Sequence, residues 1–340
     1  MKNLMNKVIR QTEFWVFVII VVLALLIQMR SGAFFANNNI VDIMRSMICP
    51  ALYAVCALLA FVSTGPDVSF PLIAALSSYL AIVVTYGTGY DGPWPLVFLI
   101  GMCFGALMGA LNGFIIVKYK FPSLIVTLGT SSLFSGILLG AFEAERMALP
   151  GTLQRFGSMN LLTVSNEKTG LGSALPMTFL ILIAVYIIAY LILNFTMVGR
   201  GVYAVGGDEI SAERAGFDVK KIRFGIFVIN GMIAAIGGLC YSVMSMKYLP
   251  TEFAGGEMVV IAAIVLGGAR LTGGVGTLKG CILGTLLLTM VTNSLILAGI
   301  SVYWQKVFIG GIIIIGTAIP AIQYFIGNNK SKKVKGGEAA

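Results

Sequence analysis

The 340-residue chain contains no histidine, and only 11% of its residues are charged. Without histidine it has neither imidazole metal ligands nor an imidazole acid or base. No GxxxxGK[ST] sequence is present, which excludes ATP hydrolysis through a phosphate-binding loop of that type in this chain. The five cysteines have no Cys-x-x-Cys spacing, so we expect small, buried, unpaired thiols. They are Cys49, Cys56, Cys103, Cys240 and Cys281.

Apolar sequence is what the chain has in excess: 58% of its residues are hydrophobic, and its mean hydropathy is +0.95. A soluble domain of this length would expose more polar surface. A bilayer core about 30 Å thick takes roughly 20 apolar residues per helix, so we expect an all-α polytopic membrane protein. The ten expected spans are about 14–29, 42–62, 68–86, 94–117, 123–141, 176–196, 222–246, 257–269, 276–298 and 304–326. The eighth is short and is therefore either tilted or re-entrant.

Basic residues orient these spans. With a cytoplasmic N-terminus, 16 of the 23 Lys and Arg residues face the cytoplasm and seven face the other side, as the positive-inside rule requires. If 257–269 did not cross, Arg270, Lys279 and the basic C-terminal end would lie outside. We therefore predict ten crossings with both termini in the cytoplasm. Loops that face anionic membrane lipid explain the net charge of +9 better than a nucleic-acid partner does.

The expected organisation is a single transmembrane domain at 1–326, followed by a basic cytoplasmic tail at 327–340. Residues 143–175 are the longest polar stretch between spans, and they lie on the extracytoplasmic side in this topology. A polar loop of this length is typically functional or disordered. It is either a solvated connector or a platform for an extracytoplasmic partner.

Two groups of glycines predict close packing. The first recurs every four residues along one span, a spacing that lets helix backbones approach; a helix that slides during gating is the alternative. These glycines are Gly101, Gly105, Gly109 and Gly113. The second group predicts a tight turn between the eighth and ninth spans, because no strand precedes it and Lys279 does not follow a glycine. It comprises Gly267, Gly268, Gly273, Gly274, Gly276 and Gly280.

Polar residues inside the spans are few, and such residues are costly in lipid and often functional. Asp67 stands out because Gly65, Pro66 and Pro71 interrupt the helical pattern around it. It is either the N-cap of the third span or a residue of a solute pathway. Asn112, Asn230 and Asn293 are weaker pathway candidates, since interhelical hydrogen bonds explain each of them.

A charged segment at 200–223 interrupts the apolar sequence with nine charged residues. Its residues predict a short helix, for which Asp208 is a good N-cap and Gly216 suits the C′ position. Glu209 and Arg214 suit the two ends of the helix dipole. Short isolated helices are marginal in water, so caps at both ends indicate a helix that docks onto a soluble partner. The alternative is a solvated loop helix.

Four stretches together resemble the membrane permease subunits of ribose/galactose-type sugar ABC importers, the inner-membrane component of binding-protein-dependent transport systems. The larger group also handles amino acids and nucleosides. The resemblance covers nearly all of the chain from Asn37 onward. Its most specific stretches are ALNGFIIVKYKFPSLIVTLGT (110–130), GRGVYAVGGDEISAERAGFDVKKIR (199–223), AIVLGGARLTGGVGTLKG (263–280) and VYWQKVFIGGIIII (302–315).

The resemblance implies a type II-like ABC importer permease fold in the bacterial plasma (inner) membrane. The cytoplasmic coupling loop would be 199–223, with a coupling helix that docks into an ABC ATPase subunit; Asp208 replaces the usual Asn of the family. The implied coupling residues are Gly206, Gly207, Asp208, Glu209, Glu213, Arg214 and Gly216. ATP and Mg²⁺ would bind the partner ATPase, leaving this chain with no cofactor. The resemblance also implies a second permease copy, identical or not, and an extracytoplasmic solute-binding protein.

One departure concerns the residues after the second span. Family members commonly read Gly-Gly-Ile-Asp-Leu-Ser-Val-Gly, whereas this chain reads GPDVSFP from Gly65 to Pro71. Two glycines have become prolines, which fix φ and remove a donor. This departure bears on the solute, which is expected to be a monosaccharide, rather than on the function class. An ion-coupled secondary transporter is the alternative function, although its usual intramembrane relays are nearly absent here, and Asp67, Asn112 and Asn293 are the candidate pathway residues.

Overall fold

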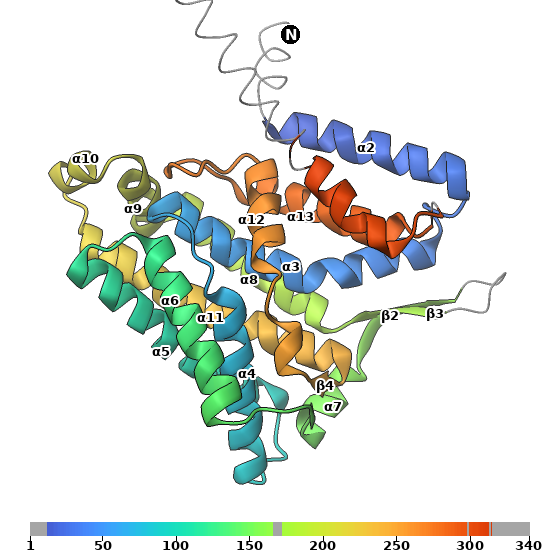
Figure 1. Cartoon of the computed structure of the whole chain (residues 1–340), viewed down its shortest axis with the longest axis horizontal. Helices are drawn as coiled ribbons and strands as arrows, with labels where there is room; N and C mark the ends of the chain where they lie inside the picture. Colours follow the sequence, from blue (N-terminus) through green and yellow to red (C-terminus); the bar gives the residue numbers. More distant parts are fainter. Residues whose placement is uncertain (1–11, 166–171, 298, 313, 315–340) are drawn as a thin grey trace, which may run out of the picture.

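The structure is a computed structural model that describes residues 12–165, 172–297, 299–312 and 314, and it is mostly helical (Figure 1). Seven of the described helical segments are long and apolar enough to cross a membrane. They are α2 (Thr12–Ser31), α3 (Asn37–Ser63), α4 (Phe70–Gly87), α5 (Trp94–Tyr119), α6 (Ser123–Gly136) continued by a π-helical turn (Ile137–Ala141), α8 (Thr178–Phe195) and α11 (Val219–Ser245). The chain is therefore a polytopic membrane protein.

The last three expected spans are less regular. α12 (Glu257–Leu266) has ten residues and α13 (Leu278–Ser294) has 17, both shorter than a full crossing helix. Residues 305–312 are helical, and the rest of the tenth span lies outside the described residues, as do both termini and the basic tail at 327–340. Ten crossings with cytoplasmic termini thus stay a prediction.

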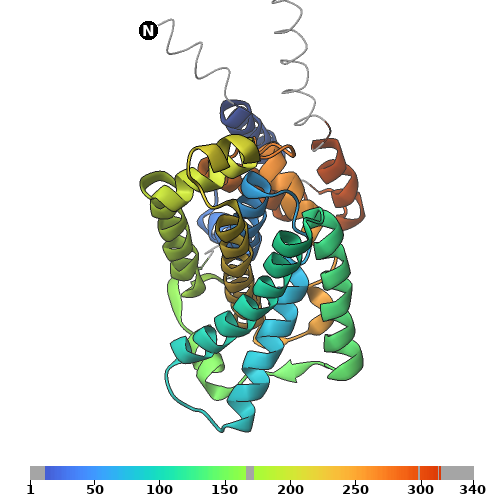
Figure 2. The same ribbon diagram turned by 90° about the vertical axis from the view of Figure 1, so that its left-hand side faces the viewer.

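The molecule has two distinct ends (Figures 1 and 2). We call one the α10 end; it comprises α9 (Met197–Gly207), α10 (Glu209–Arg214) and the loop 267–277. The other is the α7 end, with α7 (Gly151–Gly157), β1 (Met147–Ala148) and β4 (Lys247–Tyr248). The chain passes from one to the other between β4 and the loop 267–277, so the short α12 and the irregular residues before it together make that passage.

α5 and α11 pack closely along their length, and glycines make this possible. A Cβ added at Gly105 would lie 2.2 Å from the Gly231 carbonyl oxygen, and one at Gly109 would lie 2.1 Å from the Phe227 carbonyl oxygen. Close packing is therefore confirmed for this ridge. It is confirmed for the 267–280 turn as well, where a Cβ on Gly280 would lie 1.9 Å from the Gly267 carbonyl oxygen.

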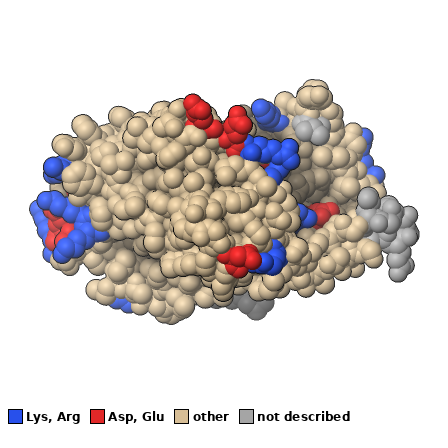
Figure 3. Space-filling model, turned by 90° about the horizontal axis from the view of Figure 1, so that it is seen from below, with Lys and Arg blue, Asp and Glu red and all other residues tan. Residues whose placement is uncertain are grey.

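The surface is dominated by apolar side chains. Figure 3 shows a largely uncharged face on which acidic and basic groups gather in a few small places. Long apolar side chains are exposed along the helices, for example Leu107 (67%), Ile187 (54%) and Phe195 (68%). A lipid environment accounts for this exposure, because such a surface would be costly in water.

The mostly helical fold is confirmed, but the described residues also contain four short strands, which the expectation of an all-α protein did not include. β1 pairs antiparallel with β4, and β2 (Asn160–Ser165) pairs antiparallel with β3 (Gly172–Pro176). These pairs satisfy backbone groups that the loop would otherwise leave open. The described residues of the polar stretch 143–175 therefore include regular structure on both sides of α7, and its role as a connector or a platform stays a prediction.

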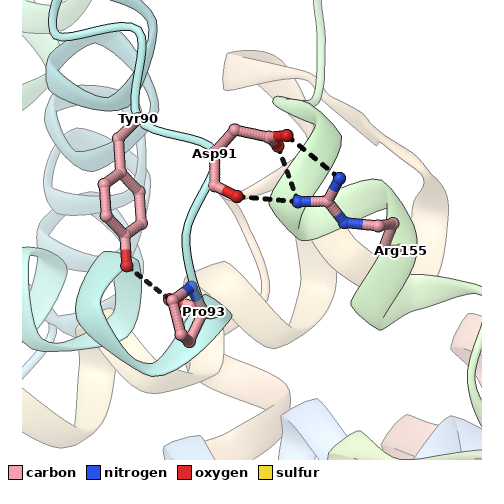
Figure 4. Close-up of polar contacts among 4 residues, drawn as sticks. All are labelled: Tyr90, Asp91, Pro93 and Arg155. Carbon is pink, nitrogen blue, oxygen red and sulfur yellow. Dashed lines mark hydrogen bonds and ion pairs between the residues drawn. The ribbon is translucent and has the colours of Figure 1, made fainter.

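α7 is fixed by buried rings and by an exposed ion pair. Leu153 is fully buried, and the Phe156 ring stacks on Trp94 with ring centroids 4.1 Å apart. Arg155 donates to both carboxylate oxygens of Asp91, at 2.6 and 3.2 Å, and to its backbone carbonyl (Figure 4). These contacts join the 143–175 segment to the turn between α4 and α5.

All five cysteines are free thiols. Four are buried, as expected. The Cys281 thiol and the Tyr186 hydroxyl are hydrogen-bonded to each other at 3.5 Å. Cys103 is exposed on α5, so the expectation of burial is wrong there. Exposure of a small apolar thiol to lipid costs little free energy, so the sequence around Cys103 does not distinguish a buried from a lipid-facing position.

Candidate functional site

The N-terminus of α10 is capped as the sequence predicts. An Oδ1 atom of Asp208 accepts a hydrogen bond from the Ser211 backbone N–H at 2.6 Å. This bond satisfies one of the amide groups that a helix start leaves open. It also lowers the pKa of Asp208 below its usual value, because the charged carboxylate is the better acceptor.

The C-terminus of α10 closes with a Schellman motif. Gly216 has a φ of +89°, and its N–H donates to the Glu213 carbonyl at 3.0 Å. The Phe217 N–H donates to the Ala212 carbonyl at 3.1 Å. Glycine adopts this left-handed conformation without the Cβ penalty, so the prediction that Gly216 occupies C′ is confirmed.

α9, which was not predicted from the sequence, leads directly into α10. Thr196 caps it by accepting from the Gly199 N–H, and Asp208 ends it while starting α10. The signal was available in the sequence: a threonine three residues before a glycine, followed by a helical run. Two consecutive helices, α9 and α10, therefore occupy residues 197–214, where one helix was expected.

Close backbone contact anchors α9 to the rest of the α10 end. A Cβ added at Gly206 would lie 1.6 Å from the Val62 carbonyl oxygen, at the end of α3. The same carbonyl accepts from the Gly274 N–H at 3.0 Å. The Tyr203 hydroxyl donates to the Gly276 carbonyl at 2.9 Å. The α9–α10 turn, α3 and the loop 267–277 thus meet at one point, next to a polar cavity of about 230 Å³.

α10 divides into an inner and an outer face. On the inner face Ala212 is buried beside Val205 and Val219. Outside, Ile210 is 62% exposed, and Glu213 and Arg214 are exposed as well. An exposed isoleucine flanked by charges of both signs is a suitable contact surface for another protein.

One ion pair ties α10 to α11. The guanidinium of Arg223 lies 2.9 Å from the Glu209 carboxylate, with the two side chains 23% and 42% exposed. The pair is half-buried, so it is screened less than a surface pair. A displacement of α10 therefore reaches α11 through a side-chain contact as well as through the chain.

The second candidate region is a buried polar cluster at the break between α3 and α4. An Oδ1 atom of Asp67 accepts from the Ser69 N–H at 2.8 Å and from the Ser69 hydroxyl at 2.7 Å. The Asn112 amide donates to the same hydroxyl oxygen at 2.8 Å. The cluster joins the α3–α4 break to α5.

Asp67 is not the N-cap of α4. The helix starts at Phe70, and the Asp67 side chain closes a turn two residues earlier. Pro71 in the first helical turn already supplies a residue that needs no amide partner, which removes one demand on a cap. The cap interpretation is therefore wrong in position, and the pathway interpretation stays a prediction.

Several polar atoms of the cluster have no hydrogen-bond partner among the described residues. They are Asp67 Oδ2, Asn112 Oδ1 and both amide atoms of Asn230, a residue whose side chain faces the Asp67 carboxylate. Buried polar atoms without partners are rare and costly. Asn293, the third predicted pathway residue, lies on α13, and no hydrogen bond of the described structure joins it to this cluster.

Comparison with known proteins identifies the class. Residues 39–317 match the family described as branched-chain amino acid transport system / permease component. The chain belongs to this family; it is the permease component of a transport system rather than an enzyme, and a multi-pass protein of the bacterial inner membrane.

Individual relatives have more specific names. The ribose import permease protein RbsC of Haemophilus influenzae is 30% identical over 291 residues, which cover 86% of this chain and 87% of that protein. The autoinducer 2 import system permease protein LsrC of an Enterobacter species is 32% identical over 319 residues, covering 93% of this chain and 88% of that protein. No solved structure matches the chain.

Proposed function

We propose that the chain forms the translocation pathway of an ATP-driven ABC importer for a small solute, a monosaccharide delivered by a soluble binding protein. The observation that carries the proposal is α10: a helix capped at both ends, anchored on its inner face, and exposed on its outer face. Relatives named as ribose and autoinducer 2 import permeases support the solute class.

The proposed docking surface is the outer face of α10 on an ABC ATPase subunit. ATP and Mg²⁺ bind that partner, and this chain holds no cofactor. The coupling residues divide by role. Gly206 joins α9 to α3, and Gly207 lies beside Gly274 of the loop 267–277. Asp208 and Gly216 hold the helix ends. Glu209, Glu213 and Arg214 form the contact or its link to α11.

Movement of α10 would travel by two routes. One is the Glu209–Arg223 ion pair into α11, and the other is the Gly206–Val62 contact into α3. α11 packs along α5, and α3 ends at the break that holds Asp67. Both routes therefore converge on the helices around the buried polar cluster. Asp67, Asn112 and Asn293 are the proposed pathway residues, two of which are fully buried in this conformation.

The proposed assembly contains a second permease copy, identical or different, around a shared pathway. It also contains ten crossings per chain, with both termini and the α10 end in the cytoplasm. Lys118, Lys120, Lys220 and Lys221 gather between the end of α5 and the start of α11, and Lys220 and Lys221 follow α10 closely in the chain. This supports a cytoplasmic position for the α10 end under the positive-inside rule.

A charge reversal tests the docking surface. Glu213→Arg in the intact transporter should lower uptake and transport-coupled ATP hydrolysis about tenfold or more, because it places like charge at a contact. The matched control is Glu338→Arg, the same charge reversal in the basic tail at 327–340, which should leave both rates unchanged. Normal coupled uptake by a folded Glu213→Arg protein would refute the docking surface. Uptake driven by an ion gradient without any ATPase would instead establish a secondary transporter.

A further inference from the structure

We infer that a concave basic surface between the ends of α5 and α11 binds an anionic phospholipid. This surface, here called the lysine pocket, encloses about 460 Å³. Its lining residues are Phe114, Val117, Lys118, Lys120, Lys220, Lys221 and Phe224. Neither the docking role of α10 nor transport itself requires such a site.

The charge of the pocket is poorly balanced by the protein. Lys221 pairs with Asp218 at 3.1 Å, and this is the only carboxylate that the described residues place against the four ammonium groups. Lys118 lies over the Phe114 ring, 4.9 Å from its centroid. Three positive charges are thus left to an outside anion, and a phosphodiester group provides acceptor oxygens for several of them.

An apolar stripe leads away from the lysines and selects a lipid as the occupant. Leu107, Leu111 and Phe114 follow one another on one face of α5, and they are 67%, 38% and 48% exposed. Their spacing places them in line with Lys118 one turn further on. Acyl chains can lie along this stripe while the headgroup occupies the pocket. A free phosphate ion or an acidic protein segment has no acyl chain to lie along the stripe.

Lipid binding to the purified, detergent-solubilised chain gives the test. Phosphatidylglycerol and phosphatidylcholine are titrated separately, and bound lipid is counted by native mass spectrometry. Wild type should bind phosphatidylglycerol in preference to phosphatidylcholine. The Lys118→Gln/Lys220→Gln variant should lose roughly fivefold in affinity per lysine, and Lys118→Arg/Lys220→Arg should retain binding.

The matched control is Arg146→Gln/Lys306→Gln, which removes the same charge from two exposed residues outside the pocket. It should bind phosphatidylglycerol as wild type does, and thermal melting should show that all variants are folded. Equal phosphatidylglycerol binding by the lysine variant and wild type would overturn the inference. So would equal binding of the two lipids by wild type. Loss of a copurifying ATPase with unchanged lipid binding would make the pocket a protein contact and refute the lipid site.

Discussion

The two ends of the molecule are fastened in opposite ways. At the α7 end, bulky side chains do the work: Leu153 is fully buried, and Phe156 stacks on Trp94. At the α10 end, the closest contact is a glycine against a backbone carbonyl, Gly206 on Val62. Ring packing supplies stabilisation at the first end, whereas backbone proximity fixes a distance at the second.

This difference matches two different tasks. Buried rings hold a structure in one place, because shifting them exposes apolar area. A glycine contact contributes little burial, but it lets two backbones lie so close that a push on one is passed directly to the other. An end that passes on a push from outside needs the second kind of contact and a free outer face, and the α10 end has both.

The largest expected effect is at the α7 end. Phe156→Ala removes a ring that is 3% exposed and in contact with Trp94 and Phe98, so it should cost about 3–5 kcal/mol of stability. Thermal unfolding in detergent and protease cleavage within 151–157 measure it. Met159→Ala, at a 49% exposed site, is the control. Matching melting curves for the two variants would show that the rings do not anchor this end.

The second-largest effect is expected at the α10 end, from the addition of a single methyl group. Gly206→Ala places a carbon 1.6 Å from the Val62 oxygen, and overpacking of this kind costs about 1–3 kcal/mol. It should also displace α9 and α10 and reduce coupled ATP hydrolysis. Gly225→Ala on α11 is the matched control, because nothing lies within 4 Å of its added Cβ and it is not among the coupling residues. Equal coupling in the two variants would remove Gly206 from the route.

The ion pair at the α10 end should matter more for coupling than for stability. Glu209→Gln removes the partner of Arg223, and at its partial exposure this should cost about 0.5–1 kcal/mol. Uptake per ATP hydrolysed should fall, since one of the two routes from α10 is weakened. A double-mutant cycle with Arg223→Gln measures the interaction. Additive effects of the two substitutions would show that the pair transmits nothing.

The smallest effect concerns the exposed pair at the α7 end. The Arg155 guanidinium lowers the pKa of Asp91 below the ordinary value of 3.8. The stabilisation is therefore present above that value and is lost as pH falls through the lower folded-state pKa. Asp91→Asn should melt nearly as wild type does at neutral pH and should lack this acid-side loss. An identical fall in melting temperature below pH 4 for both proteins would contradict this assignment.

Local chemistry explains what the sequence predicted correctly. The caps of α10 depend on Asp208 and Gly216, whose preferences act within a few residues. The glycine spacing on α5 likewise predicts a closely packed neighbouring helix, although only the structure identifies that helix as α11. Membrane class and most span positions follow from composition and length.

What the sequence did not reveal depends on distant partners. Asn230 belongs with Asp67 and Asn112 only because α11 packs beside α5 and the α3–α4 break. The pairing of β1 with β4 joins residues about 100 positions apart, which no local pattern encodes. The exact start of α4 was missed because Asp67, Ser69 and Pro71 each satisfy a helix-start preference.

The outer face of α10 is the proposed docking surface for the ATPase, and a cross-link tests this docking most directly. A photoreactive amino acid in place of Ile210, 62% exposed, would be activated in the native cell, and its adduct would be identified by mass spectrometry. Replacement of Met159, exposed near the α7 end, is the control position. We expect an ABC ATPase adduct at 210 and none at 159. An ATPase adduct at 159, or its absence at 210 in an actively transporting cell, would contradict this docking.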